Sequence, residues 1–117
     1  MHPEPDFSIE QVEINRCRRL VVSGELDLAT SPQLERELTQ LCLDGAREIE
    51  IDLRRVIFID STGLRTLLNA KDICHSHAVD FFVIPSNEGM QRKLFDVTRV
   101  SGLLPWRGGR EPAGSDS

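Results

Sequence analysis

The sequence predicts a single small α/β domain with a mixed sheet that opens with an antiparallel hairpin and continues with parallel strands. The chain has 117 residues, which suits one hydrophobic core but not two independent ones. Its apolar residues change between the period of two typical of strands and the three-to-four spacing of helices. Predicted strands then alternate with predicted helices, a pattern that favours parallel strands joined by helical crossovers.

The first two predicted strands form the hairpin. Apolar and polar residues alternate imperfectly over Phe7–Ile14, and a second apolar run, Arg18–Ser23, ends at Gly24. Residues Glu25–Asp27 are expected to form a loop after this second strand. The domain is therefore expected to begin with two short antiparallel strands.

A first helix is predicted to begin at Thr30–Pro32. Either hydroxyl of Thr30 or Ser31 can cap free backbone N–H groups, and proline suits a first helical turn. Asp44 and Gly45 are expected to end this helix. Between these limits, leucines spaced by four and then three residues form one buried stripe, namely Leu34, Leu38 and Leu41.

The next strand combines two apolar patterns. Ile49, Ile51 and Leu53 alternate with polar residues, whereas Val56–Ile59 is a continuous apolar run typical of a strand buried on both faces. Between the two patterns, an irregularity is possible at Arg54–Arg55. The sequence therefore predicts a long central strand that the chain buries deeply.

The remaining elements follow in the same alternation. A second helix is predicted from Ser61 to roughly His75, with Leu64, Leu67 and Leu68 on one face, and a strand over Val79–Ile84 stops at Pro85. A short third helix over Met90–Val97 precedes Val100–Trp106. The predicted domain therefore spans residues 1–106. Residues 107–117, rich in glycine, proline and serine, are expected to form a disordered tail.

Composition argues against nucleic acid and membrane partners. The net charge is −5 and aromatic residues make up 5% of the chain, so neither a polyanion nor a stack of bases is an expected ligand. The short arginine clusters are interleaved with acids and are expected to be solvated, namely Arg16, Arg18, Arg19, Arg54 and Arg55. No leader and no apolar run long enough for a membrane span is visible, which predicts a cytoplasmic protein.

The three cysteines suggest neither a disulfide framework nor a zinc site. Cys17, Cys42 and Cys74 are an odd number without a paired short spacing. We interpret them as buried thiols in a reducing compartment.

The strongest candidates for a functional site are the residues that join the central strand to the second helix. Asp60, Ser61, Thr62 and Gly63 lie where the carboxyl end of a strand meets the amino end of a helix. Free N–H groups and the helix dipole favour negative charge there, which suits phosphorylation of a hydroxyl. The residues alone leave open a plainer interpretation, in which Asp60 or Ser61 is an N-cap and Gly63 allows tight packing.

Three segments resemble the STAS domain family, which includes anti-sigma factor antagonists and the cytoplasmic domains of sulfate transporters. Phe58–Leu64 is similar to the family signature, Gly24–Asp27 with Thr30 resembles its first loop and helix start, and Leu94–Thr98 resembles its final helix. The segments occur in the family's order. Arg99 replaces a glycine common in relatives after the last helix, so Gly102 is a candidate for that turn.

The resemblance implies a four- or five-stranded sheet backed by helices, without catalytic machinery or a cofactor. In antagonists of this family, the unphosphorylated protein captures an anti-sigma factor that is also an ATP-dependent serine kinase, and so frees the sigma factor. Phosphorylation, at the position of Ser61, ends the capture, and a serine phosphatase resets it. The expected partner-binding residues are Glu25, Leu26, Asp27, Asp60, Thr62, Gly63, Leu64 and Arg65.

Three other functions remain as alternatives. An enzyme would need a base near Ser61, but His75 and His77 lie roughly 20 Å away at 1.5 Å of helix rise per residue. A metal site on these two histidines lacks a third ligand cluster. A non-switching STAS scaffold, as a subunit of a stress-sensing or lipid-transport assembly, would share the fold without a kinase partner.

Overall fold

The computed structural model of the chain describes residues 7–86 and 104–107. Over these residues the chain alternates strands with helices, as the sequence predicted. The elements are β1 (Ser8–Ile14), β2 (Cys17–Leu26), α1 (Ser31–Leu43), β3 (Glu48–Ile59), α2 (Ser61–Ser76) and β4 (Asp80–Ile84).

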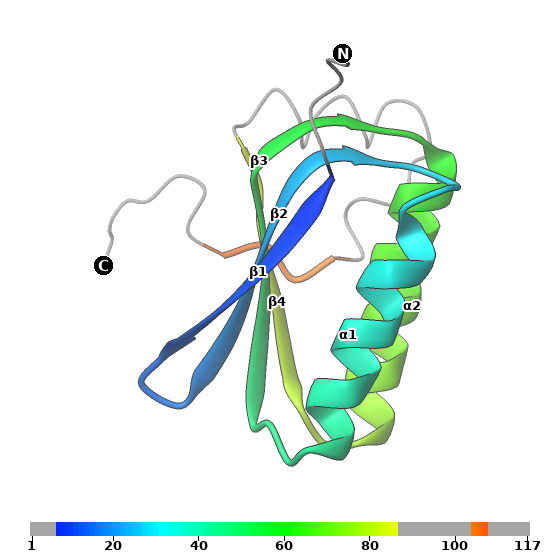
Figure 1. Cartoon of the computed structure of the whole chain (residues 1–117). Coiled ribbons are helices and arrows are strands. Elements are labelled where there is room, and N and C mark those ends of the chain that lie inside the picture. The colour runs from blue at the N-terminus through cyan, green and yellow to red at the C-terminus, as the bar shows by residue number, and fades with distance from the viewer. Residues whose placement is uncertain (1–6, 87–103, 108–117) are drawn as a thin grey trace.

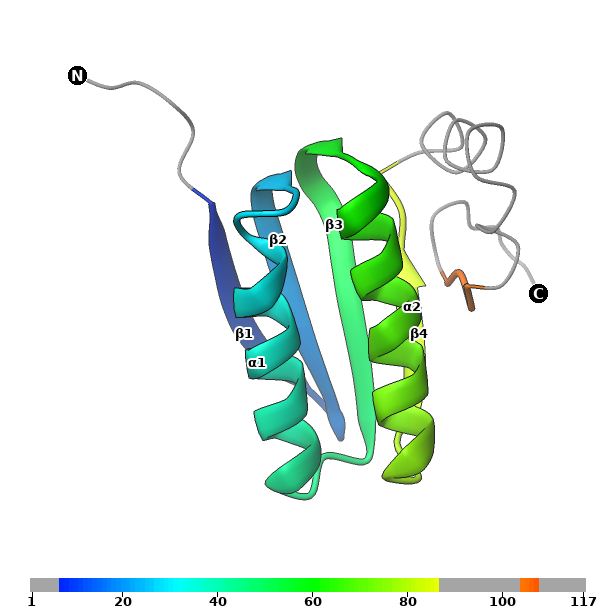
Figure 2. The same cartoon turned by 90° about the vertical axis from the view of Figure 1, so that its right-hand side faces the viewer.

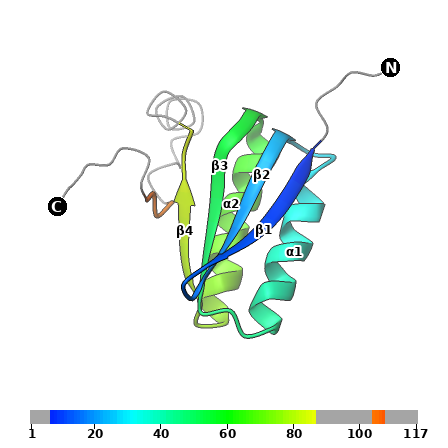
Figure 3. The same cartoon turned by 60° about the vertical axis from the view of Figure 1, so that its left-hand side comes forward.

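The sheet has the order β1-β2-β3-β4, with an antiparallel β1–β2 hairpin and parallel pairing from β2 to β4. Both crossovers place their helices on the same side, so α1 and α2 lie side by side on one face of the sheet (Figures 1 and 3). A parallel bridge between Val83 and Trp106 adds one more backbone segment beside β4. The predicted α/β class and the mixed four- to five-stranded sheet are confirmed.

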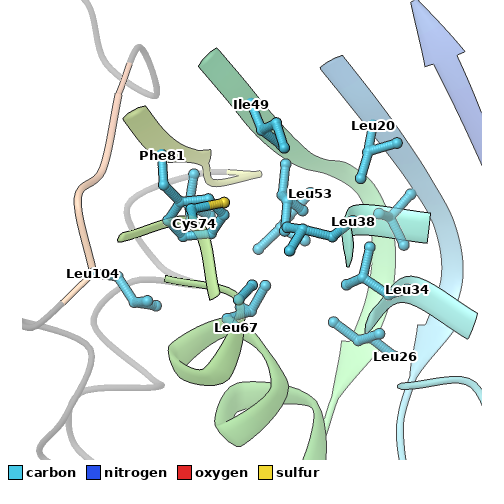
Figure 4. Close-up of a cluster of buried hydrophobic side chains, with 14 of the residues drawn as sticks. Leu20, Leu26, Leu34, Leu38, Ile49, Leu53, Leu67, Cys74, Phe81 and Leu104 are labelled. Carbon is cyan, nitrogen blue, oxygen red and sulfur yellow. The ribbon is translucent and has the colours of Figure 1, made fainter. Parts of the chain in front are cut away.

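The hydrophobic core lies between the two helices and the sheet (Figure 4). The leucine stripe of α1 is buried as predicted, and α2 contributes Leu64, Leu67 and Cys74. These side chains meet the inward-facing residues of the strands, namely Leu20, Val22, Leu26, Ile49, Ile51 and Leu53, all fully buried. As predicted, Asp44 and Gly45 close α1: Asp44 is the C-cap residue after Leu43, and Gly45 follows with φ +91°.

The predicted irregularity in the central strand is confirmed. From Val21 to Ser23, β2 advances two residues while β3 advances three, from Asp52 to Arg55. Such a bulge bends the strand and increases its twist. In Figure 1 the upper parts of β2 and β3 curve over toward the amino ends of the helices.

A second irregularity overturns the expectation for Val56–Ile59. As β2 advances one residue from Gly24 to Glu25, β3 advances two, so Ile57 is an extra residue. The side chains of Ile57 and Phe58 are 64% and 51% exposed, so this run is not buried on both faces. The run also lies beyond the pairing with β4, which ends at Asp52.

Among the described residues, the face of the sheet without α1 and α2 carries a charged cluster. The side chain of Glu50 is only 6% exposed and accepts hydrogen bonds from Arg19 at 2.9 Å and Arg107 at 2.7 Å. Arg107 also pairs with Glu48 at 2.6 Å, and its guanidinium lies 3.4 Å from the centre of the Phe82 ring. This cluster joins β2, β3, β4 and the segment 104–107.

A second buried carboxylate has its own partner. Asp52, with a side chain 5% exposed, accepts hydrogen bonds from the Arg54 guanidinium at 3.0 and 2.7 Å and from the Arg54 backbone N–H at 2.9 Å. Burial disfavours ionisation of Glu50 and of Asp52, but the hydrogen bonds from their arginines outweigh it. The pKa of each carboxyl group is therefore lower than its ordinary value.

Three expectations need correction. The sequence places Arg107 in the predicted tail, but its ion pairs make it part of the folded domain. Arg19 and Arg54 pair with buried carboxylates instead of being simply solvated. Cys17 is only half-buried, whereas Cys42 and Cys74 are buried as expected.

Several predictions fall outside the described residues. They are the third helix over Met90–Val97, the Arg99 and Gly102 turn, and the tail over 108–117. Neither α1 nor α2, the helices of the described residues, combines the length and apolar character needed to cross a membrane.

The charged cluster predicts acid-sensitive stability. The lowered pKa of Glu50 means that its ionised form stabilises the fold fully above its ordinary pKa of 4.5, and this contribution is lost as the pH falls through the lowered value. Glu50→Gln should cost about 1 to 3 kcal/mol of unfolding free energy at pH 7. The difference from wild type should shrink as the pH falls below that ordinary pKa, in urea unfolding measured across this range. Glu10→Gln is the control, because it removes the same charge at an exposed position on β1. It should have little effect on stability at pH 7 or at acidic pH.

Candidate functional site

The site predicted from the sequence lies at the carboxyl edge of the sheet, which we define as the carboxyl ends of β2 and β3 with the starts of α1 and α2. Figure 2 shows these four ends next to one another. Glu25 pairs in register with Phe58, and Leu26 pairs with Ile59. The segment similar to the STAS signature and the segment similar to the family's first loop, far apart in sequence, are therefore neighbours in the fold.

Hydrogen bonds within the β2–α1 loop hold its shape. The Asp27 carboxylate accepts from the backbone N–H groups of Ala29 at 3.0 Å and Thr30 at 3.2 Å. The Thr30 hydroxyl donates to the Glu25 carbonyl at 2.7 Å and accepts from the Asp27 N–H at 2.9 Å. Thr30 is thus the N-cap residue of α1 but makes no side-chain capping bond, contrary to expectation, because its hydroxyl bridges back to the end of β2.

The first turn of α2 is capped as the sequence suggested. Asp60 is the N-cap, and its carboxylate accepts a hydrogen bond from the Gly63 N–H at 2.8 Å. Ser61 is the first helical residue and is exposed, whereas Thr62 is half-buried. The exposed hydroxyl of Ser61 therefore lies at the positive end of the α2 dipole, next to an ionisable carboxyl group.

A close backbone contact joins this turn to the end of β2. The Asp60 N–H donates to the Leu26 carbonyl at 3.3 Å. A Cβ atom placed on Gly63 would lie 2.3 Å from the same Leu26 oxygen, closer than real Cβ atoms approach. Only glycine fits at position 63. Gly63 therefore allows tight packing, as the plainer interpretation expected, and it can be part of the family signature at the same time.

The structure divides the predicted partner-binding residues into two groups. Glu25 and Arg65 are exposed, like the predicted phosphorylation site Ser61, and Asp27, Asp60 and Thr62 are half-buried at the same edge. Glu25 and Leu26 belong to β2 and not to a loop. The other group has no side chain at the surface: Leu26 is 0% and Leu64 2% exposed, both in the core, and Gly63 is buried.

Sequence reasoning missed the apolar residues of this edge. Leu28, in the β2–α1 loop, is 72% exposed, and Ile57 and Phe58 are also exposed. The period-two pattern could not reveal the last two, because the extra residue in β3 changes which side chains face the core. A run of four apolar residues directly before a polar helix start was the only available signal.

The rival sites gain no geometric support from the described residues. His75 lies in the last turn of α2, at the opposite end from Ser61. One group, Cys17 with Glu48 and Glu50, has ligand atoms within 4.8 Å of one another. The Arg107 guanidinium already pairs with both carboxylates, and burial together with the charge of Glu50 raises the pKa of Cys17 to about 12. A protonated thiol and arginine-paired carboxylates do not suit a cation.

Comparison with known proteins agrees with this geometry. A family model described as "Mlab, STAS domain" matches residues 11–105. An anti-sigma-B factor antagonist from Staphylococcus aureus is 29% identical over 106 residues, covering 91% of this chain and 97% of the relative.

Solved structures show the same fold. An anti-sigma factor antagonist from Mycobacterium paratuberculosis superposes with a TM-score of 0.75 at 23% identity, over 88% of this chain and 86% of that one. The antagonist SpoIIAA in its unphosphorylated form gives 0.62 at 23% identity, over 96% and 89%. The phosphorylated form of SpoIIAA, described as a Bacillus cell fate determinant, gives 0.62 at 20% identity, over 96% and 91%.

The contact between β2 and α2 predicts the effect of a methyl group at position 63. Gly63→Ala should destabilise the protein by about 1 to 3 kcal/mol, because the new Cβ would collide with a carbonyl oxygen that is fixed in the sheet. Alanine normally stabilises a helix relative to glycine, so a loss of stability in Gly63→Ala would point to the collision and not to helix propensity. Thr62→Ala, one position earlier, should change stability far less. Urea unfolding of the three proteins makes the comparison, and an unchanged or increased stability of Gly63→Ala would show that the contact relaxes freely.

Proposed function

This chain belongs to the STAS domain family, and on that premise we propose that it is an anti-sigma factor antagonist controlled by phosphorylation of Ser61. In the unphosphorylated state it binds an anti-sigma factor that is also a serine kinase, which releases the sigma factor. Phosphorylation of Ser61 by that kinase ends the binding, and a serine phosphatase restores it. The proposal places the protein in the cytoplasm, where its three thiols stay reduced.

The observation that carries this proposal is the position of the Ser61 hydroxyl. It is exposed at the first helical position of α2, so a kinase can reach it without unfolding the domain. Thr62, the other hydroxyl of the motif, is half-buried. The pair of SpoIIAA structures, one unphosphorylated and one phosphorylated, supports a switch of this kind in a protein of similar fold.

The local physics allows a phosphate to change binding while the fold stays intact. The amino end of a helix favours an anion, so a phosphate on Ser61 does not oppose α2. In a docked complex, however, the phosphate would lose water and lie beside the Asp60 carboxylate and any acid on the partner. At ~4 Å and an effective dielectric near 20, each unit repulsion is about 4 kcal/mol before screening, which is enough to abolish binding.

A non-switching STAS subunit is the alternative. It would present the same edge to a permanent partner in a stress-sensing or lipid-transport assembly, and no kinase would act on it. The two functions differ in a single observable, the modification of Ser61 by an ATP-dependent kinase encoded in the same genome.

The first functional prediction concerns Ser61 itself. Incubation with the purified anti-sigma kinase and ATP should place one phosphate on Ser61, and the product should bind that kinase at least a hundredfold more weakly with an unchanged circular dichroism spectrum. Ser61→Ala should bind constitutively. Ser61→Asp carries one negative charge and should reproduce the off state only in part.

Mass spectrometry locates the phosphate and calorimetry measures the affinities. Modification confined to Thr62 would overturn the assignment of the acceptor. Loss of secondary structure on phosphorylation would instead overturn the electrostatic mechanism.

The second functional prediction concerns the charges around Ser61. Asp27→Lys and Arg65→Glu should each weaken binding of the anti-sigma factor by roughly 1 to 3 kcal/mol. Arg65→Glu reverses an exposed charge at the carboxyl edge, and Asp27→Lys reverses a charge there and also removes the carboxylate that holds the β2–α1 loop. Asp72→Lys, an exposed reversal near the far end of α2, is the matched control. Affinities equal to wild type for both edge variants would place the interface elsewhere.

A further inference from the structure

Three large apolar side chains are exposed at the carboxyl edge. Leu28 is 72%, Ile57 is 64% and Phe58 is 51% exposed. Isolated exposed apolar residues are ordinary, but several at one edge of a small domain are typical of an interaction surface. We define these three residues as the apolar patch.

The exposure of the apolar patch depends on the extra residue in β3. Val56 is buried, so an unbroken period of two would turn Phe58 inward and Ile59 outward. The extra residue at Ile57 reverses this order: Phe58 is exposed, whereas Ile59 packs against the core. Bulges of this kind are common beside functional sites, where they redirect a side chain.

The patch and the proposed phosphorylation site belong to the same edge of the sheet. Phe58 precedes Ser61 by three residues and pairs in register with Glu25, two residues before the loop that holds Asp27. Leu28 follows Asp27 in that loop. Ile57 and Phe58 belong to the last residues of β3, and the curved end of this strand leads to the start of α2 in Figures 1 and 2.

We propose that the apolar patch is the docking anchor for the anti-sigma factor, with Phe58 at its centre. This inference rests on the proposed function and names the surface that the partner uses. The partner would offer an apolar recess for Phe58, with basic groups facing Glu25 and Asp27. Aromatic side chains buried at the centre of an interface commonly dominate binding.

The charge around the patch distinguishes this partner from other occupants. The charged side chains of the same segments are the carboxylates of Glu25, Asp27 and Asp60 and the guanidiniums of Arg55 and Arg65, which leaves a net negative charge. A second copy docked face to face would oppose two surfaces of the same net negative charge. An anionic lipid surface would be repelled for the same reason. A protein with basic groups around an apolar recess fits both features.

The position of the patch also gives phosphorylation a second effect. Docking of Phe58 and Ile57 against an apolar surface would exclude water from the neighbouring Ser61. A serine hydroxyl tolerates this loss of water, whereas a phosphate with nearly two negative charges does not. Water exclusion by the patch would therefore increase the cost of docking the phosphorylated form.

The experiment measures binding of the purified anti-sigma factor from the same genome to variants of the full chain. Phe58→Ala should weaken binding on the order of tenfold or more, Leu28→Ala and Ile57→Ala less, and Phe58→Leu should restore part of the loss. Leu43→Ala is the matched control, because Leu43 is 65% exposed at the opposite end of α1 and should bind like wild type. Melting temperatures verify that each variant is folded, and Phe58→Leu with Ile57→Ala continues the test if Phe58→Ala unfolds.

The outcomes separate this inference from the proposed function. If the wild type binds in a phosphorylation-sensitive way and all patch variants bind with the same affinity, the docking anchor alone is overturned. Absence of wild-type binding would overturn both. Concentration-dependent dimerisation in sedimentation, lost in Phe58→Ala while anti-sigma factor binding is kept, would assign the patch to a second copy of the chain and would also overturn the proposal.

Discussion

The contact between the Leu26 carbonyl and the first turn of α2 determines the geometry of the whole carboxyl edge. The carbonyl accepts from the Asp60 N–H and leaves no room for a Cβ on Gly63. Because the end of β2 and the start of α2 are so close, the β2–α1 loop lies next to Ser61. Charged and apolar residues at the end of β2 therefore share one surface with the start of α2. One glycine allows two distant sequence segments to act as a single surface.

The elements were predictable because their periodicity is strong and their ends carry clear signals. The leucine stripe of α1, the Asp60 cap and the glycine after α1 need only local chemistry, and each was found as expected. The segment Val56–Ile59 was predicted wrongly because burial there depends on register with β2. An extra residue in one strand of a pair has no signature in that strand's own sequence.

The second failure of sequence reasoning concerned charge. Arg107 looked like part of a polar tail, and Arg19 and Arg54 looked like solvated residues. Their roles depend on Glu50 and Asp52, which alternate with core residues on β3 and face away from the helices. A buried carboxylate is tolerated only when paired. Asp52 finds its partner two positions along β3, in Arg54, whereas Glu50 depends on Arg19 and Arg107 from other parts of the chain. Pairing between residues 57 positions apart, as for Arg107 and Glu50, cannot be read from local patterns.

The extra residue at Ile57 also predicts how this segment can vary in length. Deleting Ile57 would remove the bulge but leave Phe58 opposite Glu25 and Ile59 opposite Leu26, where they pair now. Val56, Phe58 and Ile59 would then face inward, outward and inward by simple alternation, and the start of α2 would keep its contact with the Leu26 carbonyl. A relative with a one-residue alignment gap at position 57 should therefore keep this edge of the fold but expose one apolar side chain fewer there.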